Sequence, residues 1–226
     1  ACAHRPWIDA LPAVLHPRDL ADAAEAVGLI DDPAHQCRRP LAWTPSAGSL
    51  LLVGALGSGT TSAALALVAS CVRGATPQAL HVYVIDTSGD AAWTPVVSVE
   101  HCGAVVRVAE IERVVRLLAR LATEIDRRSA DGTRQPAIVV VIDGLASLRD
   151  SLGSVELADA AVRLDRILRD GPAVGIVSII TTDGLSTSAL AVPRAATWVF
   201  HTDDPAIARA GGLRTIGALP AVAGRV

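Results

Sequence analysis

The sequence predicts an α/β fold in which a mostly parallel β-sheet is covered by helices on both faces. Short apolar runs rich in Val, Ile and Leu alternate with segments of helical periodicity, which indicates repeated strand–helix–strand units. The runs are continuously apolar, as in parallel strands that are buried on both faces. Hydrophobic residues make up 51% of the chain and aromatic residues only 3%, so the core is expected to be aliphatic.

Length, charge and cysteine content narrow the class of protein. The 226 residues suffice for one α/β domain, and the net charge of −3 does not favour a DNA-tracking surface. Four widely spaced cysteines without a C-x-x-C motif indicate reduced thiols in a cytosolic protein: Cys2, Cys37, Cys71 and Cys102. No apolar run approaches the ~18 residues that cross a bilayer. Because residue 1 is Ala, we expect the chain to be part of a longer protein.

Residues 1–49 are expected to form a lead-in segment that packs on the domain formed by residues 50–226. In this lead-in, prolines bound one short edge strand at residues 5–12, and residues 28–36 are rich in turn formers. From Leu50 onward the pattern becomes regular. Strands are predicted at residues 50–53, 80–85, 103–108, 137–143, 173–180 and 197–201.

Three helices are predicted between these strands, from the glycine-rich loop to about residue 73, at 110–128 and at 154–170. The second carries charged residues opposite its apolar face, as expected of a solvated surface. The positions expected to face the core recur at helical spacing. They are Leu65, Val68, Ala69 and Val72 in the first helix, Ile111, Val114, Val115, Leu118, Leu121 and Ile125 in the second, and Leu157, Ala161, Leu164 and Leu168 in the third.

The stretch LLLVGALGSGTTSAAL at residues 50–65 carries the strongest functional signal. An apolar strand, a glycine-rich loop and a helix follow one another, which is the layout of a phosphate-binding P-loop with the signature G-x-x-x-x-G-K-[ST]. Gly54, Gly59 and Thr61 match the signature, whereas Thr60 stands in place of the lysine. Backbone N–H groups of such a loop bind phosphate oxygens. The residues predicted to contact a nucleotide are Gly54, Gly57, Ser58, Gly59, Thr60, Thr61, Ser62 and Asp143.

Two further strand ends complete this predicted site, because ligands of an open α/β sheet bind at the carboxyl ends of its strands. Asp143 ends an apolar run in the position of a Walker B aspartate, so Thr61 and Asp143 are predicted to hold the Mg²⁺ ion of a bound ATP. Thr181 and Thr182 end another strand, where they are placed to sense a γ-phosphate or an attacking water.

The bland alternative is a glycine-rich turn that binds no phosphate, with Asp143 as a solvated acid at a strand end. Another pair of acids, Asp86 and Asp90, is interpreted as turn formers after a strand. His201, at the end of the last predicted strand, is interpreted as structural.

Two residues depart from the pattern of an active ATPase. With Thr60 in place of lysine, charge-assisted contacts to the β- and γ-phosphates are lost. Gly144 follows Asp143, where hydrolysing relatives of this architecture commonly carry a second acid that activates water. We therefore expect weak nucleotide binding, weak or absent hydrolysis, and no catalytic residue.

The ordered set of motifs resembles FtsK/SpoIIIE-type ATPase domains, and most closely the tandem C-terminal ATPase domains of EccC, the motor subunit of type VII secretion. The resemblance covers nearly the whole chain. It rests on residues 28–36 and 51–59, HVYVID at 81–86, HCGAVV at 101–106, DRR at 126–128, VVVIDGL at 139–145, DPA at 204–206, GGL at 211–213 and LPAVAGR at 219–225.

The resemblance implies a RecA/FtsK-like P-loop fold within a membrane-associated hexameric machine at the cytoplasmic face of the membrane. It also implies neighbouring ATPase domains in the same chain and secreted helical substrates of the Esx type. Later domains of such motors are often degenerate and serve in substrate docking or regulation, which agrees with Thr60 and Gly144. Hydrolysis in the family needs a trans-acting arginine, and the available residues are Arg127, Arg128, Arg194, Arg209 and Arg214.

Three functions fit these observations. The first is a degenerate ATPase domain of an EccC-like secretion motor that acts in nucleotide sensing, substrate docking or regulation. The alternative is an active ring ATPase that translocates protein or DNA, with the lysine replaced from elsewhere; the near-neutral composition makes DNA the less favoured cargo. The third is a scaffold domain that keeps the fold only to complete the oligomer.

Overall fold

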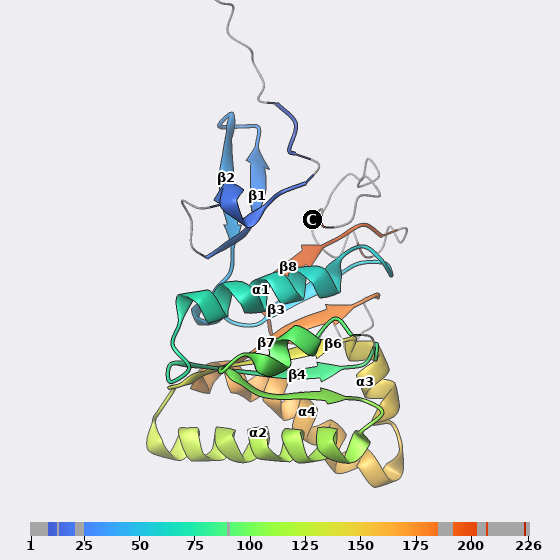
Figure 1. Cartoon of the computed structure of the whole chain (residues 1–226). Helices are drawn as coiled ribbons and strands as arrows, with labels where there is room; N and C mark the ends of the chain where they lie inside the picture. Colours follow the sequence, from blue (N-terminus) through green and yellow to red (C-terminus); the bar gives the residue numbers. More distant parts are fainter. Residues whose placement is uncertain are drawn as a thin grey trace, which may run out of the picture.

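The computed structural model describes residues 9–12, 14–20, 25–89, 91–184, 192–202, 207 and 224. Within this part of the chain six strands form one parallel sheet (Figure 1): β3 (Leu50–Val53), β4 (Leu80–Asp86), β5 (Cys102–Arg107), β6 (Ala137–Asp143), β7 (Ile176–Thr182) and β8 (Ala196–Val199). Their order is β5–β4–β6–β7–β3–β8. The P-loop strand β3 therefore lies between β7 and β8, and β7 separates it from β6. The predicted α/β fold with a parallel sheet is confirmed.

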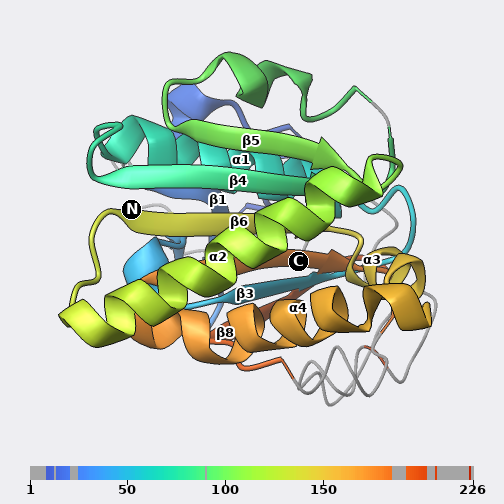
Figure 2. The same ribbon diagram turned by 90° about the horizontal axis from the view of Figure 1, so that it is seen from below.

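Helices cover both faces of this sheet. Helix α1 (Thr60–Gly74) lies on one face, and α2 (Ile111–Asp131) and α4 (Ala158–Asp170) lie side by side on the other (Figures 1 and 2). The short helix α3 (Leu145–Ser151) follows β6 directly. Five 3₁₀ turns complete the described elements: η1 (Pro17–Leu20), η2 (Pro45–Ala47), η3 (Thr94–Ser98), η4 (Val155–Leu157) and η5 (Gly171–Val174).

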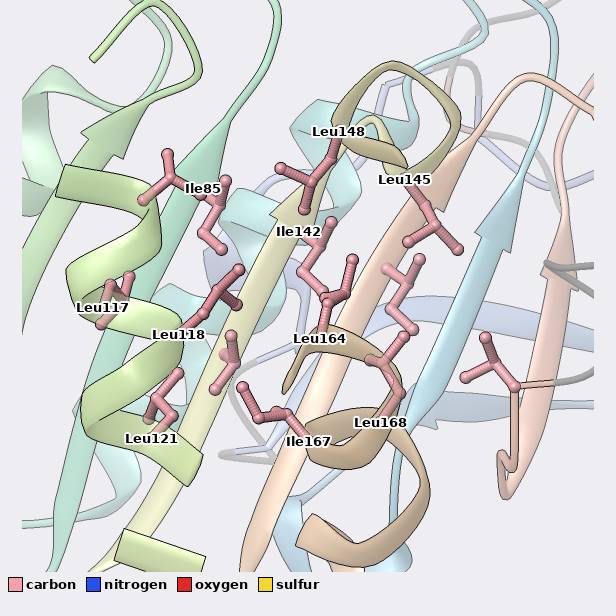
Figure 3. Packing of buried hydrophobic residues seen from close by; sticks show 14 of the residues in the cluster. Ile85, Leu117, Leu118, Leu121, Ile142, Leu145, Leu148, Leu164, Ile167 and Leu168 are labelled. Atoms are coloured by element: carbon pink, nitrogen blue, oxygen red, sulfur yellow. The ribbon is translucent and has the colours of Figure 1, made fainter. Parts of the chain in front are cut away.

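The core consists of two layers, because successive side chains of a strand point to opposite faces. In β3, Leu51 and Val53 join the cluster under α2 and α4, whereas Leu50 and Leu52 join the cluster under α1. Figure 3 shows the first cluster, in which aliphatic side chains of α2, α3 and α4 meet those of β4 and β6. All four residues of β3 are fully buried, so the strand that leads into the P-loop is held firmly.

The predicted apolar face of the first helix is confirmed in part. Val68 is buried, and Leu65 and Val72 are partly buried and pack against the same core, whereas the predicted Ala69 is exposed. The helix also buries Ala64, Leu67 and Cys71, which the prediction omitted. The helix is apolar or small on nearly every side, so periodicity alone does not fix which stripe faces the sheet. Burial raises the pKa of the Cys71 thiol to about 11, with a smaller effect of Glu25, so this cysteine stays protonated.

The lead-in contains more regular structure than predicted. Residues 33–36 form a turn, as predicted within 28–36, but the strands on either side of it, β1 (Ala26–Asp32) and β2 (Cys37–Ala42), form an antiparallel hairpin that was not predicted. The hairpin contacts α1, and Val27 packs against the core on that side of the sheet. Arg38 Nη2 ties the segment before the hairpin down by donating to the carbonyl oxygens of Asp9 and Ala10, at 2.8 and 2.9 Å.

The other predicted helices and strands differ from the observed ones mainly at their boundaries. The third predicted helix begins at Ala158, after η4, and α3 was not predicted. Residues 173–174 belong to η5, so β7 begins only at Ile176. Residues 9–12, the described part of the predicted edge strand at 5–12, form no strand. Several predicted features lie outside the described residues: Cys2, Asp90, Arg209, Arg214 and the motifs at 204–206, 211–213 and most of 219–225.

No helix among the described residues is both long enough and apolar enough to cross a bilayer.

Candidate functional site: a P-loop with a closed acidic centre

Three glycines shape the loop between β3 and α1. Gly57 and Gly59 have φ angles of +79° and +100°, a left-handed conformation that glycine adopts without steric cost. Gly54 has no space for a side chain, because a Cβ atom there would overlap Ser58 Oγ and lie 2.6 Å from Phe200 Cβ. The loop is therefore closed tightly over the end of the strand, as a P-loop requires.

The N-terminus of α1 keeps the phosphate-binding geometry of a P-loop. Among the described residues no side chain caps this helix, and Ala63 donates the first intrahelical hydrogen bond, to Gly59 O at 2.9 Å. The N–H groups of residues 59–62 therefore precede the first intrahelical donor, and they have no acceptor within the helix. Such a row of N–H groups, together with the helix dipole, favours an anion. The predicted contacts Gly59, Thr60, Thr61 and Ser62 all lie here.

Asp143 lies at the end of β6 and accepts hydrogen bonds from three side chains. Thr61 Oγ1 donates to both carboxylate oxygens, at 3.0 and 3.1 Å. Thr181 Oγ1, from the intervening strand β7, donates to Oδ1 at 2.6 Å, and Trp93 Nε1 donates to Oδ2 at 2.8 Å. The structure thus brings together three residues that the sequence placed at strand ends. The carboxylate itself is buried, with only 4% of the residue exposed, and is not the solvated acid of the bland alternative.

Trp93 is a residue of the candidate site that was not predicted from the sequence. It lies in the turn after β4, immediately before η3, and is 1% exposed. The rule that ligands gather at the carboxyl ends of parallel strands would have directed attention to the loop after β4. It would not have chosen the tryptophan within that loop.

At position 144, where an active ATPase would carry its second acid, the backbone leaves no room for a side chain. Gly144 has a φ angle of +96°, and a Cβ atom there would overlap Thr87 Oγ1. Thr87 cannot easily move away, because its Oγ1 and its N–H both donate to Asp143 O, at 2.7 and 3.1 Å. Gly144 N–H donates to Thr181 Oγ1 at 2.8 Å, which fixes the turn from the other side. A glutamate at this position has no room in the present arrangement.

The remaining predicted polar residues have structural partners. Asp86 is 1% exposed and accepts from Ser88 N, Ser88 Oγ and Gly89 N, so its interpretation as a turn former is confirmed. His201 O accepts from Ala55 N at 2.9 Å and so helps to hold the loop. Gly224 N–H donates to Ser58 O at 2.9 Å, which brings a residue close to the end of the sequence onto the P-loop.

Arg128 is unsuited to the trans-acting role, because its side chain is fully buried. Its guanidinium donates to Glu124 Oε1 at 2.7 Å and to the backbone carbonyl oxygens of Pro136, Val174 and Arg134, at 2.6, 3.0 and 3.3 Å. It therefore fixes the end of α2 to the start of β6 and to η5.

The neighbouring arginine behaves differently. Arg127 is half-exposed and pairs with Glu124 and Asp131 on the surface of α2. Hydrogen bonds from both arginines lower the pKa of Glu124 to about 2, and the bond from Arg127 has the larger effect.

The donor set fits a phosphate group and does not fit Mg²⁺. The four N–H groups at the start of α1 suit phosphate oxygens, as described above. A magnesium ion held by Thr61 and Asp143 requires free oxygen lone pairs, whereas Asp143 Oδ2 accepts from Trp93 Nε1, a group that can only donate.

Comparison with known families is consistent with this geometry. The model of the FtsK/SpoIIIE family matches residues 30–131, which include β2, the P-loop and all of α2. The predicted resemblance to FtsK/SpoIIIE-type domains is confirmed over these residues. The FtsK/SpoIIIE match ends before β6, so Asp143 and Gly144 lie outside it.

Relatives of the chain include proteins of ESX and type VII secretion. The ESX secretion system protein YukB of Bacillus subtilis is 25% identical over 197 residues, which are 78% of this chain and 13% of YukB. The structure of EssC (ATPases 2 and 3) from Geobacillus thermodenitrificans matches with a TM-score of 0.71 and 20% identity, over 100% of this chain and 45% of that one.

Thermomonospora curvata EccC (ATPases 2 and 3), solved in complex with a signal sequence peptide, matches with a TM-score of 0.68 and 20% identity, over 80% of this chain and 36% of that one. The predicted P-loop ATPase fold is confirmed by these likenesses. In each case the chain spans less than half of its relative.

Proposed function

We propose that this chain is a degenerate P-loop ATPase domain of an EccC-like secretion motor, which binds nucleotide phosphates and does not hydrolyse them at a useful rate. One contrast carries the proposal. In the described part of the chain the N-terminus of α1 has no side-chain cap, so its N–H groups are available to a phosphate, while Gly144 has no space for the acid that would activate water. A domain of this kind acts by sensing nucleotide, docking a substrate or regulating its neighbours.

The likenesses support the wider setting of this proposal. Because the chain spans less than half of two-domain EssC and EccC structures, we assign residues 50–226 to one ATPase domain, with residues 1–49 packed on it. Its proposed partners are neighbouring ATPase domains of the same chain, Esx-type helical substrates and the other subunits of a homohexamer. The EccC structure contains a signal sequence peptide, which supports the substrate proposal. We place the assembly at the cytoplasmic face of the inner membrane, as part of a membrane-anchored complex.

The test combines calorimetric titration with ATP and ADP and a phosphate-release assay. The unchanged domain should bind nucleotide without turnover. Thr60→Lys restores the missing cation and should tighten binding by about tenfold to a hundredfold, as expected of a charge-assisted hydrogen bond of roughly 1.5–3 kcal/mol. Thr133→Lys adds the same charge at an exposed position after α2 and serves as the matched control.

Each outcome separates the functions considered above. Turnover by the unchanged domain at the rate of a working motor would overturn the proposal and favour the active ring ATPase. If neither the unchanged domain nor Thr60→Lys binds ATP or ADP, the loop binds no phosphate, and the scaffold function is the one that remains. Binding by Thr60→Lys alone would mean that nucleotide binding itself has been lost and that only docking remains.

A further inference from the structure

We propose that Trp93 closes the metal position of this site, so that the loop takes its phosphate-bearing ligand without a divalent cation. The inference deepens the proposed function, because it names the ionic form of the ligand. It concerns Asp143, the residue that would otherwise hold Mg²⁺ together with Thr61.

Trp93 differs chemically from the other two donors to Asp143. A hydroxyl group, as in Thr61 and Thr181, can turn its hydrogen away and offer a lone pair to a metal, whereas an indole N–H can only donate. A metal bound at Asp143 Oδ2 would therefore face the Trp93 hydrogen, which lies on a nitrogen 2.8 Å from that oxygen.

Trp93 is also held in place by packing. It is 1% exposed and belongs to the core cluster under α1. Moving its ring away from Asp143 would open a cavity in that core, which is costly in a close-packed interior. The Trp93 donor is consequently a fixed part of the site.

Both carboxylate oxygens of Asp143 already accept from the protein. Oδ1 accepts from Thr181 and Oδ2 accepts from Trp93, while the single hydroxyl hydrogen of Thr61 is shared between the two oxygens. Three donors therefore surround a group that offers about four lone-pair sites. Mg²⁺ demands near-octahedral oxygen ligands at about 2.0–2.1 Å, so it would have to displace at least the Trp93 donor.

The absence of lysine agrees with a ligand that carries no metal. In P-loop ATPases lysine and Mg²⁺ act together on the β- and γ-phosphates. Here Thr60 removes the first cation and Trp93 excludes the second. The N–H groups at the start of α1 remain as the phosphate-binding element.

The test measures Mn²⁺ binding by paramagnetic line broadening in ¹⁵N NMR spectra, with and without ADP. In the unchanged protein, about 1 mM Mn²⁺ should leave the Gly144 and Thr61 amides and the Trp93 indole N–H unbroadened. Trp93→Phe removes the indole donor and keeps an aromatic ring, so selective broadening at Gly144 and Thr61 should appear. Asp143→Asn added to Trp93→Phe should abolish it.

Trp43→Phe is the matched control, since this indole is also buried under α1 but donates to Gly48 O, away from the site. It should respond to Mn²⁺ like the unchanged protein. In parallel titrations, Mg²⁺ should change the Kd of ADP by less than about twofold in the unchanged protein. The same ion should tighten ADP by about tenfold or more in Trp93→Phe, the effect of one added ionic contact.

Selective Mn²⁺ broadening at Gly144 and Thr61 in the unchanged protein would overturn the inference, and this arm requires no variant to fold. A folded Trp93→Phe variant that shows no selective Mn²⁺ broadening would also overturn the inference, because something other than Trp93 would then exclude the metal. If ADP binds to no form of the protein while Mn²⁺ binds only to Trp93→Phe, the inference stands and the proposed nucleotide function falls.

Discussion

Restoring the missing acid at position 144 should fail, and the structure gives the size of the obstacle. Any side chain at Gly144 must adopt a φ angle of +96°, which costs about 1–2 kcal/mol for a residue with a Cβ atom. The same Cβ would overlap Thr87 Oγ1, and overpacking of this kind costs about 1–3 kcal/mol. Gly144→Ala should therefore lower the free energy of unfolding by about 2–5 kcal/mol.

Gly132→Ala is the control that isolates the overlap with Thr87. Gly132 has a φ angle of +66°, and nothing lies within 4 Å of its Cβ position, so this variant has the backbone strain alone. Urea denaturation should show a larger loss for Gly144→Ala than for Gly132→Ala. Removing the obstructing oxygen with Thr87→Ala should recover part of the difference in the double variant.

The functional consequence is measured on Thr60→Lys combined with Gly144→Glu. This pair restores both residues of the active pattern, yet we expect no turnover in a phosphate-release assay. Equal costs for Gly144→Ala and Gly132→Ala would refute the steric reasoning. Steady hydrolysis by the pair on the order of 1 s⁻¹, the lower end for ordinary enzymes, would refute its functional conclusion.

Two further predictions concern the ion pairs at the end of α2. Arg128→Met should cost about 3–5 kcal/mol in urea denaturation, because it removes the donor of three backbone carbonyl groups and one of the two arginine partners of Glu124 at a fully buried position, whereas Arg127→Met should cost less than about 1 kcal/mol. Equal losses for the two variants would contradict the structural role of Arg128. Glu124→Gln should lower the free energy of unfolding at pH 7. This loss of stability should shrink as the pH falls from about 4.5 toward 2, because the arginines that lower the pKa of Glu124 stabilise only its ionised form. A loss that is independent of pH would show that charge is not the cause.

The strands of the parallel sheet were predictable because each lies in a short, mostly apolar run bounded by polar or turn-forming residues. β6, from Ala137 to Asp143, was predicted to the residue, and β5 was displaced by one. The hairpin was missed because β2 contains Arg38, Arg39 and Pro40, which conceal any alternation of apolar and polar positions. The face of α1 was predicted only in part, because alanine-rich helices give periodicity little contrast.

The candidate site was predictable to the extent that it depends on strand ends. Thr61, Asp143 and Thr181 follow from the rule that carboxyl ends of parallel strands meet at one edge. Trp93 and Thr87 act through loops, and their contacts depend on how the segment after β4 folds back toward Asp143. No local pattern in the sequence encodes that path.

The position of β3 in the sheet has a consequence for how the protein is made. Leu50 pairs with Ile179 on one side and with Ala196 on the other. The first strand of the sheet, β3, therefore cannot pair until the last two strands, β7 and β8, have been synthesised. During synthesis the ribosome must release nearly the whole domain before the P-loop strand has a neighbour, and such long-range pairing folds slowly. Until then the apolar run Leu50–Val53 is an unpaired strand, exposed to association with other nascent chains. The phosphate loop should therefore be among the last parts of the domain to acquire its native shape.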